Sequence, residues 1–332
     1  MAVGSINTVL PAFPGDHYRI GLQTAVCPIS PGMGLTAMVV ILIALAVPAC
    51  AQQLEPRMYT NTPVGMNFLI VGYGYANGGI LSDPSIPLKN ADIDIHETVL
   101  ACARSIDVWG RSGKIDVIVP YAWVSGSAEF NGIPGKRDVS GLGDPRLRVA
   151  VNLLGAPALR WEEFSDYRQD FILGASLQVT APFGQYDEDR LLNIGTNRWT
   201  IKPELGFSKT IGAFTFELAA SASFYTDNTD FLNGHTLAQD PIYALQGHLI
   251  FSRRSGVWLA LDGTYYTGGS TTIDGMDGAD SQSNSRLGLT VALPVTRQHS
   301  MKLYGSTGVS TRTGGDFDAV GIAWQYRWGG GL

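Results

Sequence analysis

The stretch AFTFELAASASFY, residues 213–225, alternates apolar with small or polar side chains at a period of two. Phe214, Phe216 and Leu218 lie on one face of such a segment, and Glu217 lies on the other. This period predicts a β-strand with two unlike faces. In a water-soluble sheet the apolar face packs on a core, whereas in a transmembrane barrel it faces lipid and the polar face lines the lumen.

The same alternation recurs throughout the chain after residue 52, where no segment keeps a helical period. Most of the alternating segments are long enough to cross a bilayer, which takes about 9–11 residues of a tilted strand. Strands of globular proteins are shorter, about 5–6 residues on average. We therefore predict an all-β fold, an antiparallel up-and-down transmembrane β-barrel of about twelve strands. The strands are expected near 66–76, 92–105, 114–124, 145–154, 170–181, 197–208, 213–226, 241–252, 257–267, 285–294, 300–311 and 319–328.

The connections between these strands alternate between long and short ones. The long ones, such as 77–91, 125–144 and 182–196, are rich in Gly, Asp, Asn and Ser. Outer-membrane barrels have long external loops and short periplasmic turns, and an even number of strands places both termini in the periplasm. Residues 155–169 are long for a periplasmic turn, and residues 312–318 are short for an external loop. Ten or fourteen strands therefore remain as alternatives.

The composition agrees with a barrel wall and argues against several other classes of protein. Charged residues are 16% of the 332-residue chain, and glycine is abundant at 40 residues. A soluble enzyme usually carries about 25% charged residues. The formal net charge of −6, without a basic cluster, argues against a nucleic-acid-binding protein.

The long apolar run Leu35–Ala51 ends in small residues, as a secretory signal peptide does before its cleavage site. We therefore divide the chain into an N-terminal extension plus signal peptide, residues 1–51, and a single outer-membrane barrel domain, residues 52–332. Met33 is a candidate for the true start of the protein. A membrane anchor at the N-terminus and lipidation at Cys50 are the alternatives.

The polar faces of the predicted strands carry most of the charged residues of the barrel. Charges inside a barrel pair with one another or line a path for solutes. We expect a selectivity constriction formed by Arg146, Arg148, Arg198, Lys202 and Glu204, where long side chains narrow the lumen. The alternative is a network of salt bridges that holds the barrel rigid.

Two further positions depend on the local register. Asn197, which we also expect among the residues that line the lumen, belongs to LLNIGTNRW, residues 191–199, at a transition from loop to strand. Trp199 of the same stretch is expected in the interfacial aromatic girdle. Direct contact of this stretch with a ligand and a folded-in loop anchored at Arg198 are both open. The alternation places Glu97 on the lipid face, which implies either a bulge or a wrong register in that strand.

The sequence offers little for catalysis or for a metal ion. The histidines after residue 52 are scattered, and there is no G-x-S-x-G motif. The loop DGMDGAD clusters Asp274, Asp277 and Asp280, but their spacing is not that of an EF-hand loop. We expect a solvated loop there, with no metal, no cofactor and no enzymatic activity.

The last predicted strand ends in AWQYRW, residues 323–328, where Trp324, Tyr326 and Trp328 share one face. We expect this face to point to lipid, because aromatic residues form girdles on outer-membrane barrels. Terminal aromatics at this period also favour binding by the barrel-assembly machinery. The expected partners are therefore outer-membrane lipids, this machinery and a small solute, and the expected location is the bacterial outer membrane.

Four stretches resemble a known family, the phenol-degradation (MetA-pathway) proteins of bacterial outer membranes. They are NTPVGMNFLIVGYGYANGG at 61–79, GLGDPRLRVAVNLLGAPAL at 141–159, APFGQYDEDRLLNIGTNRWTIKPELGFSKTIG at 181–212 and GIAWQYRW at 321–328. The resemblance runs from about Arg57 to Trp328. It implies a barrel that transports by passive uptake, without a catalytic reaction.

Together these observations predict an outer-membrane transporter or channel that takes up a small, hydrophobic or aromatic solute by diffusion. A non-conducting barrel with a structural or envelope-maintenance role is the first alternative. The second is a barrel enzyme that acts on envelope lipids.

Overall fold

The computed structural model describes residues 55–81, 88–130 and 133–332. The predicted signal peptide, the candidate start at Met33 and the proposed lipidation at Cys50 lie outside these residues. Strands dominate the described chain, which also contains the short helix α2 (Trp161–Phe164). The strands are β1 (Met66–Leu81), β2 (Leu88–Val108), β3 (Arg111–Phe130), β4 (Ile133–Leu142), β5 (Arg146–Leu154), β6 (Phe171–Thr180), β7 (Thr200–Ile211), β8 (Phe214–Tyr225), β9 (Asn228–Phe231), β10 (His235–Gln239), β11 (Ile242–Ser252), β12 (Trp258–Gly268), β13 (Thr271–Ile273), β14 (Met276–Asp277), β15 (Gln282–Pro294), β16 (His299–Ser310) and β17 (Gly314–Gly329).

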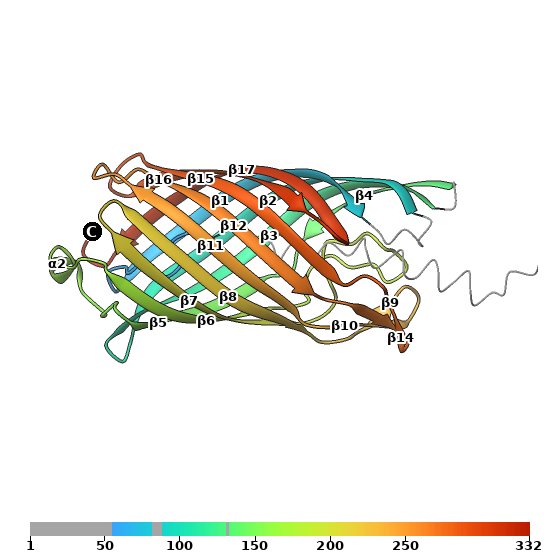
Figure 1. Ribbon diagram of the computed structural model, residues 1–332, viewed down its shortest axis with the longest axis horizontal. Helices are drawn as coiled ribbons and strands as arrows, with labels where there is room; N and C mark the ends of the chain where they lie inside the picture. The colour runs from blue at the N-terminus through green and yellow to red at the C-terminus, as the bar shows by residue number, and fades with distance from the viewer. Residues whose placement is uncertain (1–54, 82–87, 131–132) are drawn as a thin grey trace, which may run out of the picture.

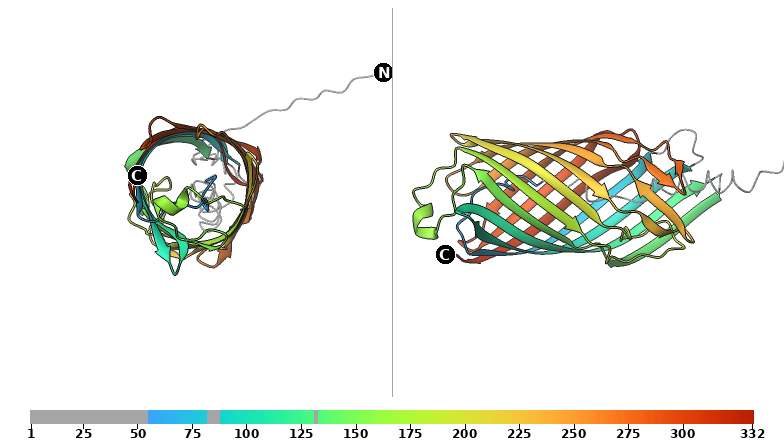
Figure 2. Two further views of the ribbon diagram at one scale, coloured as in Figure 1. Left: turned by 90° about the vertical axis from the view of Figure 1, so that its left-hand side faces the viewer. Right: turned by 90° about the horizontal axis from the view of Figure 1, so that it is seen from below.

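Thirteen of these strands form one antiparallel sheet that closes on itself. β1 pairs with β2 on one side and with the last strand, β17, on the other, and β2 also pairs with β3. The first part of β3 pairs with β5 and its second part with β4. β4 and β5 therefore share one place in the ring, and the barrel has twelve strands around its circumference, as predicted (Figure 2). Closure removes the unpaired edges that a bilayer does not tolerate.

The two faces of the wall follow the predicted alternation. Phe207 of β7 and Phe216 of β8 are exposed on the outer face, whereas Glu204 and Ser208 of β7 are buried on the inner face. Exposed apolar side chains recur in this way around the ring. An apolar outside and a polar inside are the reverse of a water-soluble protein and are typical of a barrel in lipid.

The first strand starts and the last strand ends at the same end of the barrel, where Met66 pairs with Gly329 (Figure 1). Helix α2 lies at this end, which we take as the periplasmic end because an even-stranded barrel has both termini there. The small sheet of β9, β10, β13 and β14 extends from the opposite, external end. None of the described helices is long and apolar enough to cross a membrane.

The external part of the barrel differs most from the prediction. Within the predicted loop 125–144, residues 125–130 form the end of β3 and residues 133–142 form β4, and β1 and β2 extend into the predicted loop 77–91. Beyond the bilayer both faces of a strand are in water, so the sequence there keeps no apolar period. The alternatives of ten or fourteen strands are wrong, because neither 155–169 nor 312–318 conceals an additional pair of barrel strands.

The predicted register of β2 is also wrong. Glu97 faces the lumen and not lipid, because it shares a face of β2 with Ile93 and Ile95, which pack inside the barrel. The prediction failed because the inner wall is apolar at this height, so hydrophobicity alone does not distinguish the two faces of the strand.

Candidate functional site in the barrel lumen

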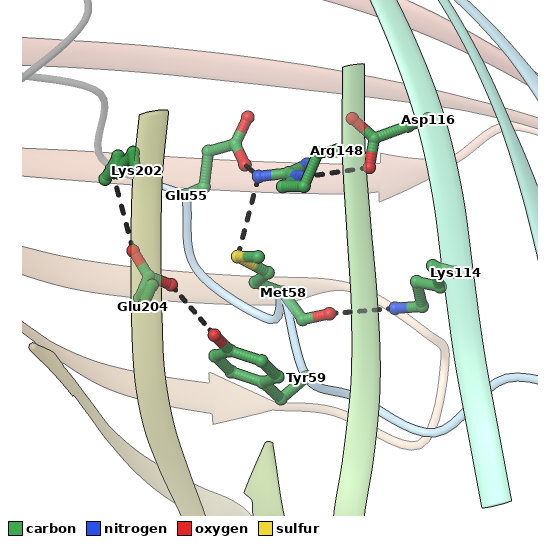
Figure 3. A network of polar contacts seen from close by, with 8 residues as sticks. All are labelled: Glu55, Met58, Tyr59, Lys114, Asp116, Arg148, Lys202 and Glu204. Carbon is green, nitrogen blue, oxygen red and sulfur yellow. Dashed lines mark hydrogen bonds and ion pairs between the residues drawn. The ribbon is translucent and has the colours of Figure 1, made fainter. Parts of the chain in front are cut away.

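A short segment before β1, residues 55–65, lies inside the barrel at its periplasmic end (Figure 2). Its Tyr59 is 5% exposed, and the ring lies over Gly174 of β6 and Gly206 of β7, which are cross-strand neighbours. A Cβ atom would lie 2.1 Å from the ring at Gly174 and 2.2 Å from it at Gly206, so glycine is required at both positions. The phenol O–H donates a hydrogen bond of 3.0 Å to Glu204 Oε1 (Figure 3). The ring thus fixes the segment to the wall.

Arg148 of β5 connects this segment to another part of the wall (Figure 3). Its Nε donates a hydrogen bond of 2.9 Å to Asp116 Oδ2 on β3, and its Nη1 forms an ion pair with Glu55 of the segment. The positive charge of Arg148 lowers the pKa of Glu55 from 4.5 to about 2. Glu55 therefore stays ionised, and the pair intact, at neutral pH.

The backbone of the segment is held as well as its side chains. Lys114 Nζ on β3 donates hydrogen bonds of 3.0 Å to the carbonyl oxygens of Met58 and Thr60. Glu217 Oε2 on β8 accepts a hydrogen bond of 2.7 Å from the backbone N–H of Arg57. The segment is therefore held by polar side chains from several strands of the ring.

The periplasmic connection 155–170 closes beneath the segment. The backbone N–H of Val64 donates a hydrogen bond of 2.9 Å to the carbonyl oxygen of Leu159, and Asn61 Nδ2 donates one of 3.2 Å to that of Pro157. A short turn at this place would not reach the segment. These contacts explain why the connection is longer than a periplasmic turn needs to be.

At the external end, the buried carboxylate of Asp144 fixes the connection between β6 and β7, residues 181–199. Asp144 lies between β4 and β5 and is 7% exposed. Its Oδ1 accepts a hydrogen bond of 2.9 Å from the N–H of Gly184, and its Oδ2 accepts two from Thr196, 2.8 Å from N–H and 2.7 Å from Oγ1. The stretches 141–159 and 181–212, which carry the family resemblance, thus meet at one side chain.

The connection 181–199 brings Leu192 into an apolar cluster inside the external part of the barrel. Leu192 is 7% exposed and packs with Ile93 of β2, Ala122 and Val124 of β3, and Phe317 of β17. We call these five residues the Leu192 cluster. The described lumen therefore contains an apolar cluster near its external end and a network of charged side chains near its periplasmic end.

The structure divides the predicted constriction into two groups. Arg148, Lys202 and Glu204 lie together around the segment 55–65, where Lys202 Nζ is 3.6 Å from Glu204 Oε2 (Figure 3). Arg146 occupies the next inward position of β5 toward the external end, opposite Thr180. These four residues face the lumen. They surround a segment of main chain that the sequence did not predict.

Asn197 and Arg198 belong instead to the external rim, so their grouping with the other lumen residues needs correction. Asn197 Nδ2 donates a hydrogen bond of 2.9 Å to Asn228 Oδ1 on β9. The guanidinium of Arg198 contacts Gln239 of β10 and lies over the ring of Tyr225, 4.5 Å from its centroid. Both residues connect the start of β7 to external elements, because the strand begins at residue 200 and not at residue 197.

The acidic loop at the external end contacts strands of the small external sheet through its carboxylates. Asp274 contacts His235, and Asp280 accepts hydrogen bonds from Thr271, 2.9 Å from N–H and 2.7 Å from Oγ1. Among the described residues, no three His, Cys, Asp or Glu side chains are grouped so that they could hold a metal ion. This loop therefore has a structural role in the small external sheet.

Sequence reasoning missed the residues that close the lumen. Gly174 and Gly206 did carry a signal, because glycine in the interior of a long strand marks a close approach of another group. Asp144, which stands before Pro145, has the residue type of a turn and gives no indication of what it binds. Tyr59 lies in a segment without regular structure, so no periodicity could reveal its position.

The comparisons with known proteins agree with this geometry. A family model described as "Putative MetA-pathway of phenol degradation" matches residues 85–323. The structure is similar to the COG4313 outer membrane channel from Pseudomonas putida F1, with a TM-score of 0.71, 21% sequence identity, and coverage of 83% of this chain and 100% of that one. It is also similar to the transport unit of the autotransporter AIDA-I from Escherichia coli, with a TM-score of 0.50, 10% identity, and coverage of 88% and 97%. No curated protein sequence matches the chain.

The two structural similarities confirm the fold of an outer-membrane barrel. The family match extends over the barrel from β2 to β17 and so covers more than half of the chain. The protein therefore belongs to the family of the MetA pathway of phenol degradation, as its sequence motifs predicted.

Proposed function

We propose that the protein is an outer-membrane channel for the passive uptake of a small, hydrophobic or aromatic solute. The observation that carries this proposal is the main-chain segment 55–65 inside the lumen. An eight-stranded barrel is filled by the side chains of its own wall, whereas twelve strands leave room for this segment. Hydrogen bonds, ion pairs and one aromatic ring hold it there, so the obstruction can be removed without breaking the wall.

The character of the solute is inferred from the external part of the lumen. A polar solute would lose its hydration against the Leu192 cluster, whereas an apolar one would not. The family description concerns the degradation of phenol, a small aromatic compound. Both observations favour a solute with an apolar or aromatic body over a sugar or an inorganic ion.

The conductance of the refolded barrel in planar bilayers tests this proposal. In Gly206→Ala the added methyl group would lie 2.2 Å from the Tyr59 ring, so the ring must leave its place. We expect this variant to open more often than the wild type. Gly247→Ala on β11 is the matched control, because its Cβ would meet no atom closer than 3.8 Å, and it should behave as the wild type.

A non-conducting barrel with a structural role predicts a different result. If neither the wild type nor Gly206→Ala conducts ions or admits phenol into liposomes, the channel proposal is wrong. Equal, measurable conductance of the wild type and Gly206→Ala would support the channel proposal but would show that the segment 55–65 does not obstruct the channel.

We also infer how the chain reaches the membrane. The apolar run 35–51 is proposed to direct export, and the last strand is proposed to bind the assembly machinery. The stacked rings of Trp324, Tyr326 and Trp328 on the outer face support this, with 5.3 Å between the centroids of Tyr326 and Trp328. His299 of β16 extends the stack onto the neighbouring strand.

A further inference from the structure

Arg146 is a buried cation of the lumen whose hydrogen-bonding capacity is not used. It is 4% exposed, and its Nε has no hydrogen-bond partner among the described residues. Thr180, directly opposite on β6, is 2% exposed, and its Oγ1 likewise has no partner within residues 55–81, 88–130 and 133–332. Buried polar atoms are nearly always hydrogen-bonded. Two such atoms on facing inward positions therefore indicate a partner that is not part of the described wall.

The next inward arginine of the same strand, Arg148, has its positive charge balanced by neighbouring carboxylates. Arg148 forms ion pairs with Asp116 and with Glu55. Arg146 forms no ion pair with a carboxylate of the described chain. Glu55 lies within electrostatic range of Arg146 but already forms an ion pair with Arg148. Glu97 on β2 interacts with Arg146 only at longer range. One positive charge of the lumen is thus left without a direct counter-ion.

Apolar groups lie on the external side of Arg146. A Cβ atom at Gly143, just before β5, would lie 2.8 Å from the ring of Pro120 and 3.5 Å from a methyl group of Ile194. Ile194 in turn packs against the Leu192 cluster. A solute that passes from the external end therefore meets apolar side chains first and the guanidinium next.

On the periplasmic side of Arg146 the lumen contains a small cavity of about 30 Å³. The neighbouring cross-strand pair, Arg148 and Gln178, lines it. Tyr59 and Glu204 line the same cavity, so it ends at the segment 55–65. The free guanidinium thus lies between an apolar wall and this cavity.

We propose that Arg146 and Thr180 form an anion subsite of the lumen, and that the solute is an amphipathic monocarboxylate with a small apolar body. This inference rests on the proposed channel function and specifies its substrate class. The planar guanidinium can donate two parallel hydrogen bonds to a carboxylate, and the Thr180 hydroxyl can donate a third. The apolar body would lie against Pro120, Ile194 and the Leu192 cluster.

The charges around the subsite favour a single negative charge on the solute. Arg146 is one uncompensated cation, and Glu97 and Glu55 lie within its electrostatic reach. A dicarboxylate or a phosphate dianion would place its second charge near these acids, and like charges repel. A neutral solute would leave the positive charge of the guanidinium without a counter-ion.

Equilibrium dialysis of the folded full-length protein in detergent micelles tests this proposal with two radiolabelled probes. Benzoate carries one carboxylate on an aromatic ring, and benzamide has nearly the same shape without the charge. We expect the wild type to bind benzoate at least about tenfold more tightly than benzamide, because hydrogen bonds to charged groups are the stronger ones. Equal binding of the two probes by the wild type would overturn the proposal without any variant.

Variants then locate the binding. Arg146→Met keeps an unbranched side chain, shorter by the guanidinium group, but removes the charge, and should weaken benzoate binding about tenfold or more. Thr180→Val keeps the shape and removes the hydroxyl, and should weaken it about threefold. Arg254→Met removes the same charge from an exposed periplasmic turn and should leave benzoate binding unchanged. Arg146→Lys, which retains the charge without the planar fork, provides a second variant if the first does not fold.

The outcomes separate this inference from the channel proposal. Undiminished benzoate binding in Arg146→Met or Arg146→Lys, or an equal loss in Arg254→Met, would overturn the subsite. Flux of radiolabelled benzoate into liposomes containing the wild-type barrel, compared with protein-free liposomes, tests the channel by itself. Flux of benzoate with no preference for benzoate over benzamide in dialysis would leave the channel and remove the subsite, whereas preferred binding of benzoate without flux would leave the subsite and remove the channel.

Discussion

Replacement of Asp144 by Asn should release the connection 181–199 from its place in the lumen. The carboxylate accepts hydrogen bonds of 2.9 Å from the N–H of Gly184, and of 2.8 Å and 2.7 Å from N–H and Oγ1 of Thr196. An amide keeps one accepting oxygen, and its NH₂ group cannot accept a hydrogen bond. Whichever way the amide turns, one of the two backbone N–H groups then faces another donor.

The size of the effect follows from these bonds. A hydrogen bond to a charged group contributes about 1.5–3 kcal/mol, and a buried donor without a partner costs about 1–3 kcal/mol. Because Asp144 loses its charge and one acceptor, we expect the connection to lose about 3 kcal/mol of local stability. About 1.4 kcal/mol corresponds to a factor of ten. The released state should therefore be about a hundredfold more populated.

Amide hydrogen exchange of the folded barrel in micelles measures this population. The amides of 182–197 should exchange about a hundredfold faster in Asp144→Asn, and those of β6 and β7 should exchange as in the wild type. Asp277→Asn is the matched control. Asp277 is an exposed external carboxylate that accepts one hydrogen bond of 3.1 Å from Thr272, so its loss should leave residues 182–197 unchanged.

Two results would refute this reasoning. Identical exchange in Asp144→Asn and the wild type would mean that the carboxylate does not hold the connection. Equally faster exchange in β6 and β7 would mean that the substitution weakens the whole barrel, and that the connection is not a separate unit.

The segment 55–65 and the last strand lead to three more predictions. Tyr59→Phe keeps the ring but loses the hydroxyl, so the binding of the segment to the wall should weaken by about 1 kcal/mol. Single-channel records should then show openings that are several-fold more frequent. Unchanged openings would contradict a role for the hydroxyl. Arg148 lowers the pKa of Glu55 from 4.5 to about 2. The ion pair therefore stabilises the closed lumen fully at a pH above 4.5, the pKa of an unpaired Glu55, and this stabilisation is lost as the pH falls toward 2, the pKa of the paired one. Openings of the wild type should stay constant from neutral pH to about pH 5 and rise below it, and openings of Glu55→Gln should be more frequent already at neutral pH. A rise of the wild type already at about pH 6 would exclude the pairing. Replacement of both Tyr326 and Trp328 by Asp should block barrel assembly in cells, because charges on the lipid face are unfavourable. If the variant still forms a folded barrel, seen as a heat-dependent shift of its band on gels, this face does not point to lipid.

The twelve strands of the ring could be predicted because a bilayer imposes one rule on each of them. A lipid-facing side chain must be apolar and a strand must be long enough to cross, so period and length were both informative in segments such as 213–225. The rule ends at the edge of the bilayer. The second half of β3 and the whole of β4 extend beyond it, and their residues 125–142 were therefore mistaken for a loop.

The closure of the lumen could not be predicted because it depends on contacts between residues distant in sequence. The ring of Tyr59 fits against the wall only because Gly174 and Gly206, more than a hundred residues later in the chain, have no side chain. Neither the tyrosine nor either glycine indicates the other two. The charged residues Arg148, Lys202 and Glu204 were identified from their polar face, but their partner in the lumen was not.

Departures from the alternation nevertheless mark where the lumen is specialised. A barrel wall that only encloses water needs polar side chains inside. Ile93 and Ile95 break this rule with apolar residues that pack with the Leu192 cluster, and Gly174 and Gly206 break it with an absent side chain that receives the Tyr59 ring. Each departure would destabilise a wall that encloses only water, and in each case a segment of the chain folds inward and packs against the residues concerned. Sequence patterns that fail locally are expected at functional sites, and here the misassigned strand face of Glu97 and the inward glycines each lie beside a segment that folds into the lumen.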